Sequence, residues 1–197
     1  MKHFNSILFI AALAAGCSSA TSRFYTLNAT ATGDGSNTNA ALAVIVGPVT
    51  IPAEVDRPQF TVRVATNQVA EDEFNRWAAP LADNIARAVA GDLSAQLGTP
   101  RVVALPAVDF ASAYRVTINV QQFETVPGKS VLVDAVWSVR LPSGATAQSG
   151  RTVASEPVSE ESYEALAAAH SRALARVSSD IAAAIRLVAE EKSGAPK

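Results

Sequence analysis

The residue whose position most clearly predicts a chemical reaction is Cys17, the only cysteine in the 197-residue chain. Small residues occupy positions 14–16 directly before it, and an apolar run over residues 4–15 follows Lys2. This order is typical of an export signal. As a helix, about 12 residues span only about 18 Å, whereas a bilayer core needs about 30 Å. We therefore predict a signal peptide over residues 1–16 and lipidation of the Cys17 thiol. The alternative is a chance cysteine beside an ordinary cleavage site.

The lipid predicted on Cys17 would fix the mature protein to a membrane. Two or more acyl chains, at about 0.8 kcal/mol per buried methylene group, make an effectively permanent anchor. The next residue is Ser18, not the aspartate that retains lipoproteins at the inner membrane of enteric bacteria, so the sequence favours the outer membrane. Residues 18–23 reach about 20 Å when extended, so we expect the domain to lie close to the periplasmic face of that membrane.

One histidine, His170, remains after the predicted cleavage. It lies four residues from both Leu166 and Leu174 on a predicted apolar helix face, and we interpret it as a core-edge residue bonded to a backbone group or to Tyr163. A catalytic base would need a serine and a carboxylate that converge on it, and the sequence has no nucleophile-elbow motif to nominate that serine. The sequence therefore predicts no catalytic residue, and a hydrolase that uses His170 is kept only as a third alternative.

Motifs for metal, cofactor and nucleic-acid binding are missing from the sequence. One histidine and one lipidated cysteine cannot supply the three ligands of a usual zinc site. We interpret the adjacent Glu71, Asp72 and Glu73 as a solvated approach to a helix, because neighbours on one chain do not converge on an ion. The formal charge of −2, about −3 once Lys2 is removed, gives no basic excess. We predict no cofactor, no metal and no nucleic-acid partner.

Two periodicities along the chain predict the elements that position these residues. Apolar runs, several of them alternating with polar residues, predict strands at 24–27, 42–46, 60–64, 102–105, 114–121, 130–141 and 146–153. Three- and four-residue spacing predicts a helix from Trp77 to Leu97, with Pro80 in its first turn. It also predicts a second helix from about Ser159 to Glu191, capped by Ser159.

The predicted fold class is α+β, an antiparallel β-sheet meander with two long helices packed on one face. We divide the chain into a signal peptide (1–16), a lipidated tether (17–23), one α+β domain (24–192) and a disordered C-terminal tail (193–197).

Segment 46–60 carries the residues of a recognisable family. It reads VGPVTIPAEVDRPQF and is followed by Asn67 and by RWAAPL from Arg76. The run FYTL from Phe24 and the predicted strand that carries Trp137 fit the same pattern. In these motifs, nearly the whole mature chain resembles the ABC-type transport auxiliary lipoproteins, specifically their PqiC branch.

The resemblance implies a non-enzymatic outer-membrane component of an envelope transport system built with membrane-anchored MCE-domain proteins. Such systems are thought to move lipids between the two membranes, and the lipoprotein would dock the periplasmic conduit. An MCE-domain transporter protein is therefore the expected partner. The alternative is a lipoprotein scaffold or regulator of cell-wall synthesis or outer-membrane assembly. A conduit that reaches the membrane could be met by a ring of identical subunits, and an open sheet edge can pair with a strand of another copy. We therefore also expect a homo-oligomer.

Five motif residues are candidates for structural or partner contacts: Asp56, Arg57, Pro58, Arg76 and Trp77. Arg57 lies in a proline-stiffened corner, where its guanidinium could pair with a carboxylate or hold strand-end carbonyls. We interpret Trp77 as a plug between helix and sheet. The alternative is exposure to a partner for Arg57, and a lipid or protein contact for Trp77.

Overall fold

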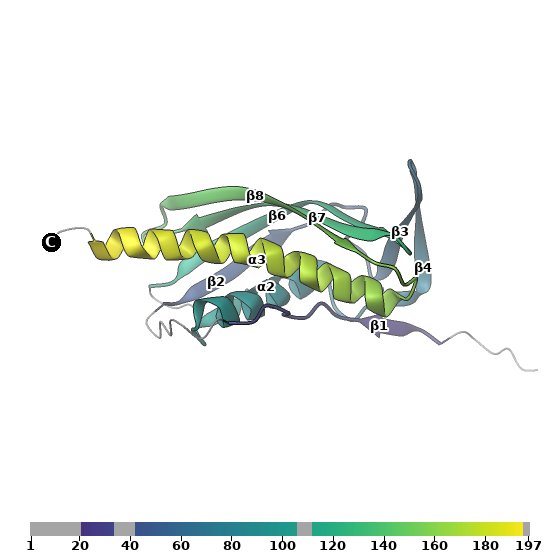
Figure 1. The fold of residues 1–197 in the computed structure, drawn as a ribbon, viewed down its shortest axis with the longest axis horizontal. Coiled ribbons are helices and arrows are strands. Elements are labelled where there is room, and N and C mark those ends of the chain that lie inside the picture. The colour runs from purple at the N-terminus through teal and green to yellow at the C-terminus, as the bar shows by residue number, and fades with distance from the viewer. Residues whose placement is uncertain (1–20, 34–41, 106–111, 195–197) are drawn as a thin grey trace, which may run out of the picture.

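The computed structural model describes residues 21–33, 42–105 and 112–194, which form two β-sheets and two helices (Figure 1). Cys17, the predicted signal peptide and residues 195–197 of the predicted tail lie outside the described residues. The strands are β1 (Arg23–Tyr25), β2 (Val44–Thr50), β3 (Gln59–Ala65), β4 (Gln68–Trp77), β5 (Val102–Ala104), β6 (Tyr114–Val126), β7 (Ser130–Arg140) and β8 (Thr146–Pro157). The helices are α2 (Leu81–Leu97) and α3 (Tyr163–Gly194). The predicted α+β class is confirmed.

The larger sheet has five strands in the order β5-β2-β6-β7-β8. Strands β6, β7 and β8 form the predicted antiparallel meander. Strand β2, however, runs parallel to both β5 and β6, which makes the sheet mixed. Val44, Ile45 and Val46 are all buried, so this strand is covered on both faces. Such an unbroken apolar run is typical of parallel strands. The antiparallel prediction came from the alternation in segments 114–121 and 130–141, and it does not hold for β2.

The smaller sheet has the order β1-β4-β3, and its β3–β4 hairpin projects from the body of the molecule (Figure 1). Strand β4 was not predicted. The sequence predicts that the acidic triplet at 71–73 precedes a helix and that Trp77 begins this helix. Both predictions are wrong, because all four residues belong to β4. Most of this strand is exposed or half-exposed, so no buried alternation marks it. Arg63 of β3 donates to Glu124 of β6 at 2.7 and 3.2 Å, which ties the hairpin to the larger sheet.

Helix α2 begins later than predicted and ends where predicted. Pro80 precedes its first residue, Leu81, and supplies the carbonyl that accepts the Asn84 amide at 3.0 Å. Proline has no N–H to lose at this end of a helix, so it favours a start here. At the other end, Gly98 adopts φ 62°, a left-handed conformation in which glycine has no Cβ penalty, and it closes the helix.

Helix α3 begins at Tyr163 and not near Ser159. The hydroxyl of Ser162 accepts the amide of Ala165 at 3.2 Å, so Ser162 takes the capping role predicted for Ser159. The amide of Val158 is held instead by the carbonyl of Lys129, which keeps the preceding segment with the β6–β7 turn. No helix in the described parts of the chain is long and apolar enough to cross a membrane.

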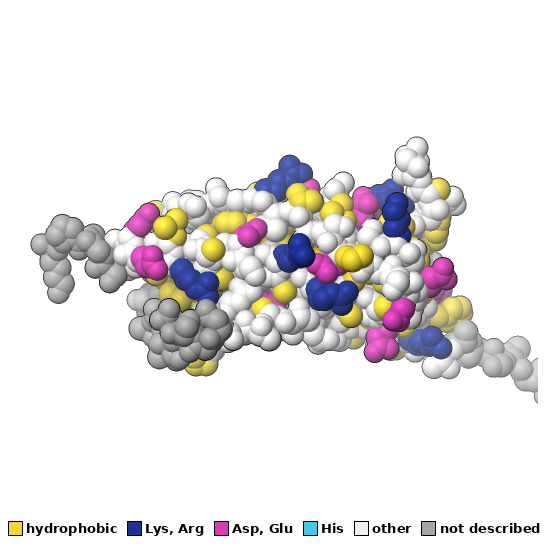
Figure 2. Space-filling view, viewed as in Figure 1, with side chains coloured by type: hydrophobic (Ala, Val, Ile, Leu, Met, Phe, Trp, Pro, Cys, Tyr) yellow, Lys and Arg dark blue, Asp and Glu magenta, His cyan; other side chains and the backbone are white. Residues whose placement is uncertain are grey.

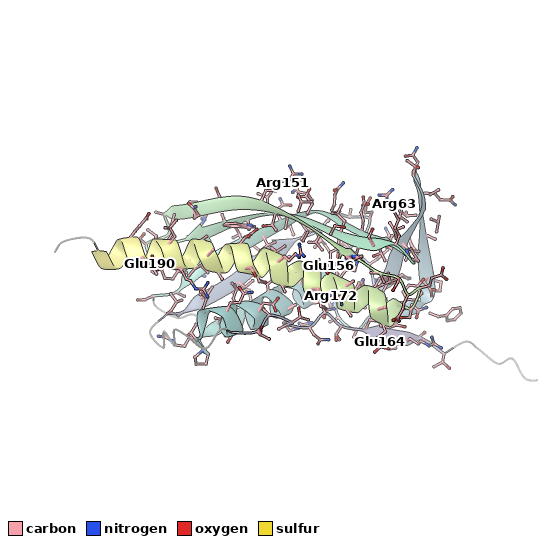
Figure 3. All side chains as sticks on the ribbon, viewed as in Figure 1. Arg63, Arg151, Glu156, Glu164, Arg172 and Glu190 are labelled. Carbon is pink, nitrogen blue, oxygen red and sulfur yellow. The ribbon has the colours of Figure 1, made fainter. Side chains whose placement is uncertain are left out.

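The two helices pack on each other and against the sheets, α2 mainly beside β2 and β5, and α3 across β7 and β8. Glu156 of β8 binds Arg172 and Arg176 of α3 at 3.4 and 2.9 Å, and Figure 3 shows Arg172 beside Glu156 where the helix crosses the strand. The indole N–H of Trp137 donates to Thr152 at 3.0 Å, and the Thr152 hydroxyl donates to Asp180 of α3 at 2.6 Å. Polar contacts therefore fix the helix on the sheet beside the apolar core.

Candidate functional site

The two family-like motifs, Asp-Arg-Pro and Arg-Trp, meet at the base of the β3–β4 hairpin. The backbone amide of Trp77 donates to the carbonyl of Pro58 at 2.7 Å. The amide of Ala78 donates to the carbonyl of Tyr25 at 2.8 Å, so the end of β1 joins the same point. Three segments that lie far apart in the sequence thus form one structural unit.

The ring of Trp77 lies inside the protein, where it is 5% exposed. It stacks on Phe60 with ring centroids 4.2 Å apart, and Phe123 of β6 meets its edge at 6.2 Å. The contacts continue through a cluster of aromatic rings: Tyr25, Phe60, Trp77, Phe123, Tyr163 and His170. Since these rings come from the small sheet, the large sheet and α3, Trp77 lies between the two sheets.

Arg57 is half-exposed and forms an ion pair with Glu71 across the hairpin. Its backbone amide donates to Val55 at 2.9 Å, while its Nε is buried without a hydrogen-bond partner within the described residues. The flanking residues Asp56 and Pro58 are exposed. The structure therefore places Arg57 in a structural pair and leaves its two neighbours at the surface.

The acidic triplet of β4 has three separate sets of partners. Glu71 pairs with Arg57, and Glu73 accepts from the Arg76 guanidinium at 3.0 Å. The Asp72 carboxylate accepts the backbone amides of residues 74 and 75 at 2.8 and 2.9 Å. Nowhere in the described ranges do three His, Cys, Asp or Glu residues gather as metal ligands would.

Asp72 also links β4 to the first turn of α3. It accepts a hydrogen bond from the Tyr163 hydroxyl. Burial, together with this negatively charged partner, raises the pKa of Tyr163 to about 12. Although partial burial acts in the opposite direction, hydrogen bonds from Asn75, Phe74 and Tyr163 give a net lowering of the Asp72 pKa. The bond therefore joins a neutral phenol to an ionised carboxylate.

His170 is fully buried, and its ring stacks on Phe123 with centroids 3.9 Å apart. Its Nε2 lies 2.8 Å from the hydroxyl of Thr125, so the predicted bond to a backbone group or to Tyr163 is wrong. A hydroxyl beside a histidine can form a nucleophile and base pair. Here Thr125 is only 2% exposed, Nδ1 has no orienting partner within the described residues, and burial lowers the His170 pKa to about 3. Such a histidine is too weak a base to activate the hydroxyl, so the pair serves packing.

Comparison with known protein families shows which family the chain belongs to. The ABC-type transport auxiliary lipoprotein components match residues 25–182, which is most of the chain. The chain belongs to this family. The family expected from the sequence motifs is thereby confirmed, and the chain is an auxiliary lipoprotein of ABC-type transport.

Solved structures share the fold of this auxiliary lipoprotein. A crystal structure of a Xanthomonas campestris protein is 17% identical, with a TM-score of 0.71 over 88% of this chain and 100% of that one. A second crystal structure, described as that of an uncharacterized protein, is 17% identical, with a TM-score of 0.69 over 84% of this chain and 99% of that one. At this identity the likeness shows the fold alone. A comparison with curated protein sequences finds no match.

The auxiliary lipoprotein also has a buried carboxylate that sequence reasoning missed. Asp92 of α2 is fully buried, and its Oδ1 accepts the backbone amides of Thr30 and Ala31, both at 2.8 Å. Its Oδ2 accepts the Ser178 hydroxyl of α3 at 3.2 Å. Burial raises the pKa of Asp92, although these hydrogen bonds act against the rise. The carboxylate fastens the segment after β1 to both helices, a role signalled in the sequence only by an acidic residue inside an apolar helix.

Proposed function

We propose that this auxiliary lipoprotein is held at the periplasmic face of the outer membrane by lipid on Cys17 and docks the periplasmic conduit of an MCE-domain transporter. Lipids would then pass between the two membranes through the assembled system. The observation that carries the proposal is the family match over residues 25–182. The small residues 14–16 before Cys17 support the lipid anchor, and Ser18 supports the outer membrane.

The geometry of the described residues supports a binding role. The β3–β4 hairpin projects from the body (Figure 1) and carries Val64 and Val69, which are 54% and 47% exposed. Two bonds between Arg63 and Glu124 hold it against the larger sheet. A projecting arm that is braced in this way can contact a partner at little cost in conformational entropy. We assign the partner contact to this hairpin and to the exposed Asp56 at its base.

The proposal includes self-association. Strand β8, with 12 residues, lies at an edge of the five-stranded sheet and can pair with another strand. Light scattering of the protein without residues 1–17 should give a mass above that of one chain. A monomer at every concentration would contradict this part of the proposal and leave the anchor and the transporter contact standing.

Fractionation and genetics test the proposed function together. The parent protein should sediment with outer membranes and carry acyl chains on Cys17, whereas Cys17→Ser should be recovered in the soluble periplasmic fraction. Loss of the gene should raise detergent sensitivity, with rescue by the parent and poor rescue by Cys17→Ser. A change in peptidoglycan or porin levels without detergent sensitivity would instead indicate a scaffold or regulator of cell-wall synthesis or outer-membrane assembly.

A further inference from the structure

Two exposed phenylalanines mark the end of the molecule at which the described chain begins. Phe24 of β1 is 64% exposed, the highest value among the large apolar side chains described, and Phe74 of β4 is 48% exposed. Figure 1 places β1 at one end of the long axis, with the C-terminal end of α3 at the other. Figure 2 shows apolar side chains on the surface at the β1 end.

Strand geometry holds both rings outward. The parallel register pairs Phe24 with Arg76 and Tyr25 with Trp77. Tyr25 and Trp77 point into the aromatic cluster, so Phe24 faces the opposite side of the small sheet. Phe74 lies two residues before Arg76, the partner of Phe24, and its 48% exposure shows that its ring also faces solvent.

Backbone contacts position the second phenylalanine. The amide of Phe74 donates to the Asp72 carboxylate at 2.8 Å, in a register irregularity of β4. The side-chain oxygen of the next residue, Asn75, accepts the Tyr25 hydroxyl at 2.8 Å, so the part of β4 that carries Phe74 is fixed to β1. The exposed ring is therefore presented by a braced backbone.

The length of the tether determines what lies opposite this surface. Six residues, 18–23, separate Cys17 from Phe24, and at full extension they reach about 20 Å. With acyl chains on Cys17 inserted in a bilayer, Phe24 cannot lie farther than this from the membrane. Helix α3 has 32 residues and is about 48 Å long at roughly 1.5 Å per residue, so its far end cannot be equally close in an upright molecule.

We propose that Phe24 and Phe74, with the exposed Arg23 beside them, form a membrane-contact surface that inserts into the headgroup region of the bilayer holding the anchor. This inference rests on the lipid anchor of the proposed function. Aromatic rings and arginine are favoured at the boundary between water and hydrocarbon, where the ring is desolvated and the charge meets phosphate. The contact orients the domain so that the C-terminal end of α3 points away from the membrane.

Tryptophan substitution in the full-length lipoprotein tests this surface. Phe24→Trp and Phe74→Trp variants are purified with their lipid, reconstituted in phosphatidylethanolamine–phosphatidylglycerol vesicles, and exposed to quenching by lipids brominated in the acyl chain. Leu187→Trp is the matched control, because Leu187 is also 48% exposed and lies near Glu190, at the opposite end of α3 in Figure 3. The parent gives the background from the buried Trp77 and Trp137.

The inference predicts that the added emission of both Phe→Trp variants falls about twofold or more with brominated lipid, while that of Leu187→Trp changes no more than the background. Vesicle flotation and the mass of the Cys17 peptide test the anchor separately. Flotation with no quenching at 24 or 74 overturns the contact surface and leaves the anchor intact. Shielding from aqueous iodide without quenching by brominated lipid also overturns it, since a second copy of the chain would then cover the rings. Failure to float overturns the anchor itself, and the contact surface with it.

Discussion

The carbonyl oxygen of Pro58 lies 2.7 Å from the backbone nitrogen of Trp77, and this hydrogen bond closes the base of the β3–β4 hairpin. Proline has no N–H to donate but retains its carbonyl, so it can close a strand end in this way. On either side of the bond, Arg57 pairs with Glu71 and the Trp77 ring stacks on Phe60. The Asp-Arg-Pro and Arg-Trp motifs therefore maintain one folded junction.

Truncation of Trp77 should be among the most damaging changes at this junction. We expect Trp77→Ala to lower the free energy of unfolding by about 3–5 kcal/mol, because it empties a buried site between the two sheets. Arg76→Ala should cost less than about 1 kcal/mol, since its pair with Glu73 is solvent-exposed. Urea denaturation of the protein without residues 1–17 measures both. Equal, small losses would show that Trp77 is not a core residue.

Asp92 should tolerate an amide better than a methyl group. Asp92→Asn keeps an oxygen for the amides of Thr30 and Ala31. Asp92→Ala leaves these two part-buried amides and the buried Ser178 hydroxyl without their acceptor and should cost about 2 kcal/mol. The unfolded carboxyl ionises at a lower pH than the folded one, because burial raises the Asp92 pKa. The parent should therefore lose stability relative to Asp92→Asn as the pH rises above about 4. A parent that instead gains stability relative to Asp92→Asn as the pH rises would contradict the raised pKa.

His170 should make the fold sensitive to acid. The pKa of His170 is about 3 in the folded protein, below the ordinary value of 6.5. On acidification the imidazole is therefore protonated in the unfolded chain at a pH at which it stays neutral in the folded protein. Stability should fall as the pH drops below about 6.5, with a contribution of about 1.4 kcal/mol per pH unit. Denaturation at pH 7 and pH 5 should show a loss that is about 2 kcal/mol smaller in His170→Phe, which keeps the stack on Phe123. An unchanged loss in that variant would assign the acid sensitivity to other groups.

Gly150 of β8 should not accept a side chain. A Cβ at this position would lie 2.4 Å from the Cζ2 atom of the Trp137 ring on the paired strand. We expect Gly150→Ala to cost about 1–3 kcal/mol through displacement of the indole. In a double-mutant cycle with Trp137→Leu, much of this cost should disappear. Additive losses would show that the close approach is not the cause.

Much of the fold could be predicted because its elements bury one regular face. The alternation along β6 and β7 and the helical spacing along α2 are direct consequences of packing on one side. Strand β4 does not fit this rule, because its segment 68–76 is exposed or half-exposed and only Trp77 at its end is buried. The same exposure explains why its acidic residues were misinterpreted as the approach to a helix.

For the candidate site, the sequence predicts which residues are of interest but not which of them are in contact. The sequence singles out the motif residues as candidates for structural or partner contacts, but no local pattern shows that Pro58 and Trp77 share a hydrogen bond. The partner of His170 was missed for the same reason, since Thr125 lies 45 residues away on β6. Asp92 was missed because a buried carboxylate depends on amides from a distant segment, and the sequence does not show which segment returns to it.

The most direct test of the proposed function is to identify what the protein touches in its native membrane. Cells that express tagged full-length protein are crosslinked, and the complexes are isolated from outer-membrane fractions and identified by mass spectrometry, with Cys17→Ser as the control for anchoring. We predict that an MCE-domain protein is the main crosslinked partner, that crosslinks concentrate on the β3–β4 hairpin, and that Cys17→Ser reduces the yield. Recovery of cell-wall enzymes or outer-membrane assembly factors without an MCE-domain protein would contradict the proposed role.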